Sequence, residues 1–114
     1  DGDISHFTGI TDKFTQLDGT LKEANFVCPR GITVDPQDNL YVTDACTNAI
    51  RKISADGKVS TLNIQWAEPN GKLYRTIPFP QEILWMNGKL YVHAEGIQSV
   101  RYVAGGAIFQ IPLN

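Results

Sequence analysis

The chain has 114 residues, of which 42% are hydrophobic and 19% are charged, and its ten basic and twelve acidic residues give a net charge of −2. This length corresponds to one small domain at most. The Lys and Arg residues are scattered, which argues against nucleic acid or an anionic membrane surface as a partner, and no apolar run approaches the roughly 20 residues of a membrane-spanning helix.

The sequence contains two copies of one repeat, preceded by a remnant of a third. Three sets of positions align between the full copies: Pro29 with Pro80, Leu40–Val42 with Leu90–Val92, and Ile50–Arg51 with Val100–Arg101. The recurrence of Arg51 as Arg101 favours an architectural contact over a role in a single active site. The remnant is DGDISHF at residues 1–7, which matches DGKVSTL at residues 56–62.

The repeat divides the chain into five parts. In order, they are the outer strand of a preceding copy (1–9), a connection (10–28), a first full copy (29–62), a second connection (63–79) and a second full copy (80–114).

Each full copy holds four short alternating segments bounded by turn residues, the pattern of β-strands. The predicted strands are 31–35, 39–44, 49–54 and 58–62 in the first copy, and 82–86, 89–93, 99–103 and 107–111 in the second. Asn87-Gly88 and Gly105-Gly106 supply the positive φ angles of tight hairpins. Each copy is therefore expected to form one antiparallel meander.

A four-stranded sheet of this kind leaves apolar faces uncovered by itself, whereas such sheets are stable when they stack radially as propeller blades. Propellers typically have four to eight blades. The predicted fold class is all-β, with four-stranded antiparallel blades that form an incomplete portion of a β-propeller.

The first copy resembles an NHL repeat. The resemblance rests on FVCPRGITVD at residues 26–35, NLYVTD at 39–44, IRKI at 50–53 and DGKVSTL at 56–62. The second copy departs from it, because Glu82, Met86 and Ala94 replace Gly31, Asp35 and Asp44. The resemblance implies a six-bladed propeller, of which this chain would be about a third.

Cys28 and Cys46 lie just beyond the expected hairpin of the first copy. If Asp35 faces Leu40, residue 28 lies opposite residue 47, and one irregular step would bring the two cysteines within bridging distance. Two buried free thiols are the alternative. The chain also resembles the peptidyl-hydroxyglycine lyases, which have one Cys ahead of a Pro and its disulfide partner after the next strand. That resemblance implies a Cys28–Cys46 disulfide and an extracellular or secretory-pathway location.

The common catalytic signatures HExxH, GxSxG, GxGxxG and the P-loop do not occur. In those lyases a catalytic tyrosine precedes the second cysteine, whereas this chain has Ala45. We therefore predict no catalytic residue, no cofactor and no metal site, and we expect Asp35 and Asp44 to accept hydrogen bonds from nearby backbone N–H groups. His93 and Glu95 are the one pair with a ligand-like arrangement, to which a polar strand end is the alternative.

The second connection holds Trp66, Tyr74 and Arg75, residue types that anchor protein interfaces. His93 and Glu95 are expected at the same end of the propeller, so these five are the candidate binding residues. Alternatively, Trp66 and Phe79 fill the gap between the blades.

The predicted function is a noncatalytic protein-binding or scaffolding propeller outside the cytoplasm. Its partners would be other blades of the same propeller, neighbouring chains or a separate protein. One alternative is a fragment of a secreted propeller enzyme, lyase or lactonase-like, with its catalytic groups mostly on other blades. Another is a structural subunit of an extracellular assembly.

Overall fold

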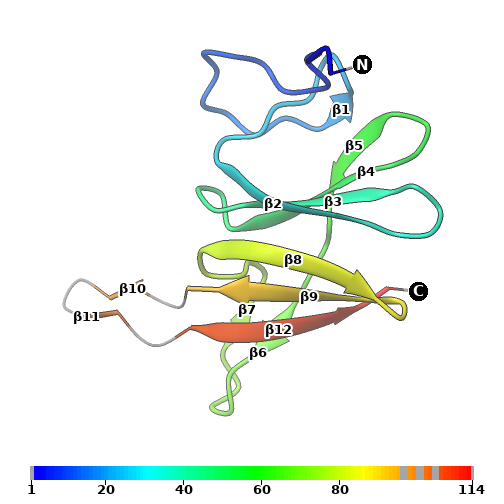
Figure 1. The fold of residues 1–114 in the computed structure, drawn as a ribbon. Helices are drawn as coiled ribbons and strands as arrows, with labels where there is room; N and C mark the ends of the chain where they lie inside the picture. The colour runs from blue at the N-terminus through cyan, green and yellow to red at the C-terminus, as the bar shows by residue number, and fades with distance from the viewer. Residues whose placement is uncertain (1, 96–97, 100–101, 104–105, 114) are drawn as a thin grey trace.

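A computed structural model describes residues 2–95, 98–99, 102–103 and 106–113, and the regular structure in this part of the chain is entirely antiparallel β (Figure 1). The predicted fold class is confirmed: the chain forms an incomplete propeller of stacked sheets. No helix long and apolar enough to cross a membrane occurs in the described residues.

The first sheet has the strand order β1-β5-β4-β3-β2. Its strands are β1 (Gly19–Thr20), β2 (Pro29–Val34), β3 (Leu40–Asp44), β4 (Ala49–Ile53) and β5 (Lys58–Thr61). β2 to β5 are the four strands expected between residues 29 and 62, with ends that differ by one or two residues. β1 is an addition from the N-terminal connection, and it pairs with the outer edge of β5.

The β2–β3 hairpin is one residue tighter than predicted. Val34 rather than Asp35 lies opposite Leu40, because the Asp35 N–H donates to the Asn39 carbonyl and closes the turn. The ladder shifts again at a β-bulge between Pro29 and Ile32, after which Pro29 lies opposite Asp44. The tighter turn by itself gives the one-residue shift that the cysteine pairing required, because it sets residue 28 opposite residue 46, and the bulge moves the register one residue further.

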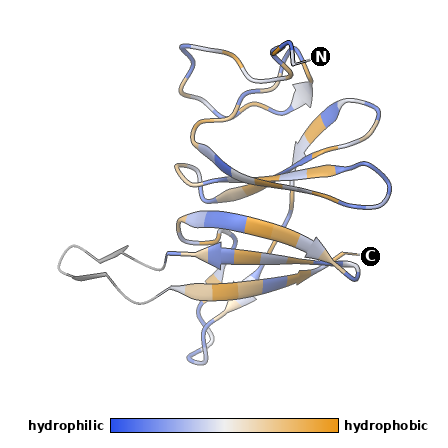
Figure 2. Ribbon diagram, in the orientation of Figure 1, coloured by the Kyte–Doolittle hydropathy of each residue, from blue (hydrophilic) through white to orange (hydrophobic). Residues whose placement is uncertain are grey.

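The second sheet has the order β12-β9-β8. It consists of β8 (Pro80–Met86), β9 (Lys89–Ala94) and β12 (Ala107–Pro112). The hairpin between β8 and β9 has Asn87 and Gly88 at φ angles of 51° and 79°, as expected for this Asn-Gly turn. Figure 2 shows hydrophobic and more polar positions alternating along β9, whereas β8 and β12 each have adjacent hydrophobic positions. Because neighbouring residues of a strand point to opposite faces, this sheet has apolar side chains on both faces.

The prediction for the third and fourth strands of the second copy was wrong. Residues 107–111 were expected to be the outermost strand, yet β12 pairs directly with β9, in the place expected for residues 99–103. β10 (Gln98–Ser99) and β11 (Tyr102–Val103) instead pair with each other in a separate hairpin. β12 takes the place because Phe109 and Ile111 extend the apolar face of Leu90 and Val92.

This arrangement also changes the repeat alignment. Val42 lies opposite Arg51, whereas the equivalent Val92 lies opposite Phe109. Phe109 therefore stands where Arg51 stands in the first sheet, and Arg101, the predicted equivalent, lies outside the described residues.

The outer strand predicted within residues 1–9 is also absent from residues 2–9. Residues 2–28 instead run over the first sheet, where β1 is their contribution to its edge (Figure 1).

The two sheets pack against each other as neighbouring blades, with β8 lying against β2 and β3. The core between them contains Tyr41, Ile50, Ile83, Leu90 and Val92, all of which are buried. A Cβ atom added to Gly31 would lie 2.5 Å from the Gln81 carbonyl oxygen, so this close approach requires glycine. A second core, Ala24, Val42, Ile53 and Val59, lies on the other face of the first sheet.

Two further connections fix the blades side by side. The Trp85 N–H donates to Thr33 Oγ1 at 3.0 Å, and the Thr43 hydroxyl donates to the Gln81 carbonyl. Both bonds join strands of different sheets, so the blade interface has polar as well as apolar contacts.

Candidate functional site

One end of the two stacked sheets is built from residues 45–48, which join β3 to β4, and from residues 62–79, which join β5 to β8. We call this the loop end. The second of these segments contains the small hairpin β6 (Trp66–Ala67) and β7 (Leu73–Tyr74). Most of the predicted binding residues belong to this end.

A buried carboxylate organises the start of the loop end. Asp44 is fully buried and accepts hydrogen bonds from four backbone N–H groups, those of Val27, Cys28, Cys46 and Thr47, at 2.6 to 3.2 Å. Its oxygens are therefore occupied by the backbone of two segments, as the sequence predicted, and Asp44 has a structural role.

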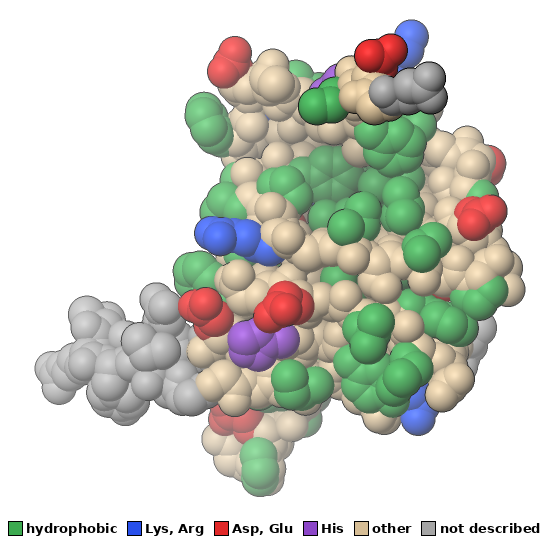
Figure 3. All heavy atoms as spheres, viewed as in Figure 1, with side chains coloured by type: hydrophobic (Ala, Val, Ile, Leu, Met, Phe, Trp, Pro, Cys, Tyr) green, Lys and Arg blue, Asp and Glu red, His purple; other side chains and the backbone are tan. Residues whose placement is uncertain are grey.

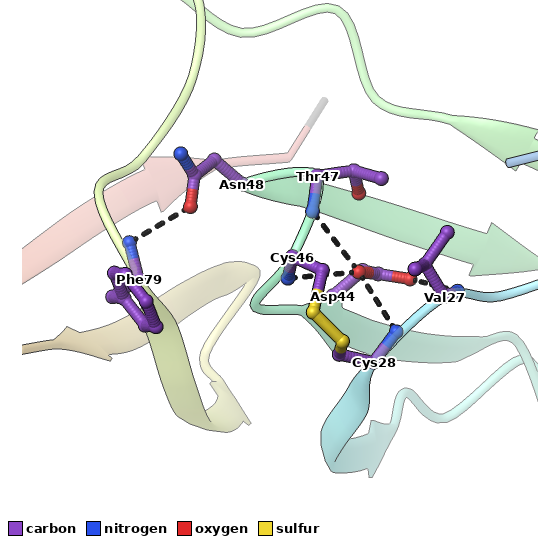
Figure 4. The surroundings of a disulfide bond; sticks show 7 residues. All are labelled: Val27, Cys28, Asp44, Cys46, Thr47, Asn48 and Phe79. Atoms are coloured by element: carbon purple, nitrogen blue, oxygen red, sulfur yellow. Dashed lines mark hydrogen bonds between the residues drawn. A yellow bond between two sulfur atoms is a disulfide. The ribbon is translucent and has the colours of Figure 1, made fainter. Parts of the chain in front are cut away.

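Cys28 and Cys46 form a disulfide beside this carboxylate, with Cα atoms 5.3 Å apart (Figure 4). The Ala45 N–H donates to the Cys28 carbonyl, which extends the β2–β3 pairing up to the bridge. The predicted disulfide is thus present, and it joins the segment before β2 to the turn after β3. Ala45, where the lyases have a tyrosine, is buried.

Asn48 fastens the connection 62–79 to the first blade. It has a φ of 59°, in the left-handed region that Asn tolerates better than most residues. Its side-chain oxygen accepts a hydrogen bond from the Phe79 N–H at 3.0 Å (Figure 4), and its carbonyl accepts one from Ile77. Ile77 is buried, whereas Phe79 is 37% exposed.

A pocket of about 230 Å³ lies between the turn 45–48 and the connection 62–79. We call it the loop-end pocket. Its polar lining residues are Gln16, Thr47, Asn48, Thr61, Arg75 and Thr76, and its apolar ones are Ala49, Leu62 and Ile64. The sequence pointed to Arg75 but not to the other five polar residues, which come from four separate segments and form no motif.

Arg51 lies opposite Thr61, a lining residue of this pocket, and is fully buried. It donates to the carbonyls of Leu17 and Asn25 and pairs with Asp18 at 2.8 Å, and its guanidinium stacks on the Phe26 ring. These bonds hold the N-terminal connection on the first sheet, which agrees with the architectural contact expected for Arg51.

Trp66 and Tyr74 lie opposite each other on the β6–β7 hairpin, with their rings stacked at a centroid distance of 4.5 Å. Trp66 also contacts the Phe109 ring edge-on at 4.9 Å, and its indole N–H donates to the Thr76 carbonyl. Trp66 is half-buried and anchors the hairpin to β12. The Tyr74 hydroxyl donates to Glu68.

His93 is not among the residues that line the loop-end pocket. It lies on the face of the second sheet that points away from the first, and its Nδ1 is 3.5 Å from the Glu82 carboxylate rather than paired with Glu95. Glu95 follows β9 and is exposed. Among the described residues, no group of three or more His, Cys, Asp or Glu side chains could hold a metal ion.

At the opposite end of the first sheet, Asp35 caps the β2–β3 turn. It accepts from the Gln37 N–H, from both the N–H and the side chain of Asn39, and from the Tyr41 hydroxyl. Burial by itself would raise the pKa of Asp35, but these hydrogen bonds together hold it below its usual value. Burial, and then the bond to Asp35, raise the pKa of Tyr41 to about 12.

The comparisons with known proteins agree with this geometry. Residues 26–53, from the start of β2 to the end of β4 with three preceding residues, match the model of the NHL repeat. Residues 26–53 form an NHL repeat. None of the curated proteins matches the chain significantly.

Two solved structures from Bacteroides thetaiotaomicron resemble this chain. One is a structural genomics protein of unknown function, with 30% sequence identity and a TM-score of 0.66 over 77% of this chain. The other is an auxiliary nutrient binding protein, with 18% identity and a TM-score of 0.57 over 75% of this chain, and this second likeness shows the fold alone. The NHL-type chain spans 24% of the length of each of these structures.

Proposed function

We propose that the chain supplies two neighbouring blades of a larger NHL-type propeller, and that this propeller is a noncatalytic protein-binding or scaffolding module outside the cytoplasm. The division into two blades (29–62 and 80–114) and the connections that precede them is part of this proposal. The observation that carries it is the pair of apolar sheet faces that the two blades leave exposed.

The second blade shows one of these faces. Leu84, Met86 and Ile108 are 54%, 45% and 67% exposed on the side of the sheet that points away from the first blade. The first blade shows the other, where Ile32 and Val34 are 61% and 51% exposed. Figure 3 shows apolar side chains gathered over both sheets. Apolar patches of this kind mark interaction surfaces.

The stacking already present indicates what covers these faces. In the first blade, the face of Tyr41 and Thr43 is covered by the second blade, and Tyr91 and His93 occupy the equivalent positions on the open face. A further blade of the same fold therefore fits this face. The chain spans 24% of the length of each similar structure, which leaves room for further blades and supports the same proposal.

The binding role rests on the loop end. Tyr74 and Arg75 are accessible there, next to Trp66 on a hairpin anchored to β12, and such aromatic and arginine residues carry much of the energy of protein interfaces. The nutrient-binding description of one similar fold supports a binding role. The Cys28–Cys46 disulfide supports an oxidising, extracytoplasmic location.

A charge placed on the open face tests the proposal. In the purified protein, Ile108→Glu would bury an unpaired carboxylate if a further blade covers β12, and the expected loss of unfolding free energy is about 2 kcal/mol or more. Leu73→Glu is the control, because Leu73 is similarly exposed (57%) but lies on the β6–β7 hairpin. Equal, small effects of both changes in chemical unfolding would show that this face stays in water and would overturn the proposal.

A further inference from the structure

The loop-end pocket carries an inference that is independent of the blade interface. We propose that it binds a small hydroxylated anion with the size and chemistry of a sugar acid. Its volume of about 230 Å³ is below that of pockets that hold drug-sized ligands, so a monosaccharide-sized molecule fits it better.

The orientation of the Gln16 side-chain amide is fixed by its neighbours. Asp18 accepts from Arg51 at 2.8 Å and from the Thr61 hydroxyl at 3.0 Å. A carboxylate paired with arginine has no proton to donate, so the Thr61 hydroxyl is the donor to Asp18. The Thr61 oxygen then accepts from Gln16 Nε2 at 3.2 Å. Gln16 therefore presents its amide oxygen, an acceptor, to the rest of its surroundings.

Two polar atoms of the pocket lining are buried without a protein partner among the described residues, Gln16 Oε1 and Thr47 Oγ1. Thr47 uses its backbone N–H to bind Asp44, which leaves the hydroxyl free of that network. Buried polar atoms in proteins are normally hydrogen-bonded. Ligand hydroxyls suit both atoms, because a hydroxyl can donate to the Gln16 oxygen and can donate to or accept from the Thr47 hydroxyl.

The charge of the pocket selects an anion. Arg75 lines it with an exposed guanidinium, and no Asp or Glu is among the lining residues that the structure describes. Guanidinium groups bind carboxylates through paired, charge-assisted hydrogen bonds. Ala49, Leu62 and Ile64 add an apolar wall, which suits the C–H surface of a sugar ring. Together, a carboxylate, several hydroxyls and a small apolar surface describe a sugar acid.

The test uses three probes on the purified protein: D-glucuronate, D-glucose, which lacks the carboxylate, and acetate, which lacks the hydroxyls. Calorimetric titration is expected to show glucuronate binding at least tenfold more tightly than either of the others. Arg75→Gln is expected to weaken glucuronate binding at least tenfold. Arg30→Gln is the matched control, because Arg30 is an exposed arginine of β2 that does not line this pocket, and it is expected to bind like the parent protein.

Thr47→Val provides a second, nearly isosteric variant that removes one of the two unpaired atoms, and it is expected to weaken both glucuronate and glucose. Thermal unfolding of each variant verifies that it folds, and Thr47→Val decides the test if Arg75→Gln does not fold. The proposal is overturned if none of the probes binds at 10 mM, if acetate binds as tightly as glucuronate, or if the folded variants bind like the parent. These outcomes leave the blade interface unaffected, since Ile108 is on another face.

Discussion

Single carboxylates determine how the turns of the first blade are built. Asp35 and Asp44 are both buried, and each accepts four hydrogen bonds within 3.2 Å. The second blade has Met86 and Ala94 at the equivalent positions, and its hairpin relies on the Asn87-Gly88 turn instead. The two blades therefore build their first hairpins by different local means, a turn held by Asp35 in the first and the Asn87-Gly88 turn in the second.

Asp35 makes the stability of the fold depend on pH. Because hydrogen bonds lower its pKa in the folded chain, its contribution is fully present above the unfolded pKa of about 3.9 and is lost as the pH falls through the lower, folded value. Asp35→Asn is expected to lower the unfolding free energy at pH 7 by about 1–3 kcal/mol. The same change is expected to make stability fall less steeply below pH 4.

Urea unfolding of the parent and the variant between pH 2.5 and 7 measures both effects. Asp38→Asn is the control, because Asp38 is exposed in the same turn at a φ of 65°, which Asn also adopts readily. A parallel acid-side decrease in parent and Asp35→Asn would contradict the role assigned to Asp35.

The sequence predicted more of the fold than of the candidate site. β2 to β5 were predictable because apolar alternation and turn residues coincide there, and because Asp35 and Asp44 are local signals. The register of β2 against β3 was one residue off, since the side chain of Asp35 tightens the turn in a way that alternation does not reveal.

In the second blade the same signals were ambiguous. Residues 99–103 and 107–111 alternate in a similar way, and the choice between them depends on packing against Leu90 and Val92. The loop-end pocket was beyond sequence analysis for a related reason. Gln16, Thr47, Thr61 and Arg75 are brought together by the fold, and the spacing between them carries no pattern.

The disulfide is expected to stabilise a whole element, the β2–β3 hairpin, together with the segment that precedes β2. Cys28 and Cys46 are 18 residues apart, and closing a loop of this length is expected to contribute roughly 3 kcal/mol in the chain-entropy model. The double variant Cys28→Ala, Cys46→Ala is therefore expected to unfold at a lower denaturant concentration than the parent. Peptide mapping without reductant is expected to show the linked pair, and two alkylatable thiols in the native protein would contradict the bridge.

On the scale of the whole molecule, the position of Gly31 shows how closely one blade packs against the next. Gly31 lies where the Gln81 carbonyl approaches most closely, and Glu82 is its equivalent in the second blade. The Glu82 side chain is 88% exposed and faces His93. A blade that follows the second one must therefore leave room for this pair, and its spacing there will differ from that between the first two.

The exposed sheet faces predict that residues 1–114 associate when they are separated from any further blades. Ile32, Val34, Leu84, Met86 and Ile108 would then remain in water on two sheet faces, and apolar areas of this kind favour association. The isolated segment is expected to self-associate and to bind a hydrophobic dye, whereas a longer chain that contains further blades would remain monomeric and bind less dye. Light scattering and dye fluorescence at several protein concentrations measure the difference. A monodisperse monomer of residues 1–114 that unfolds sharply and reversibly would show that two blades suffice, because burial between the sheets, the N-terminal connection and the disulfide would then outweigh both exposed faces.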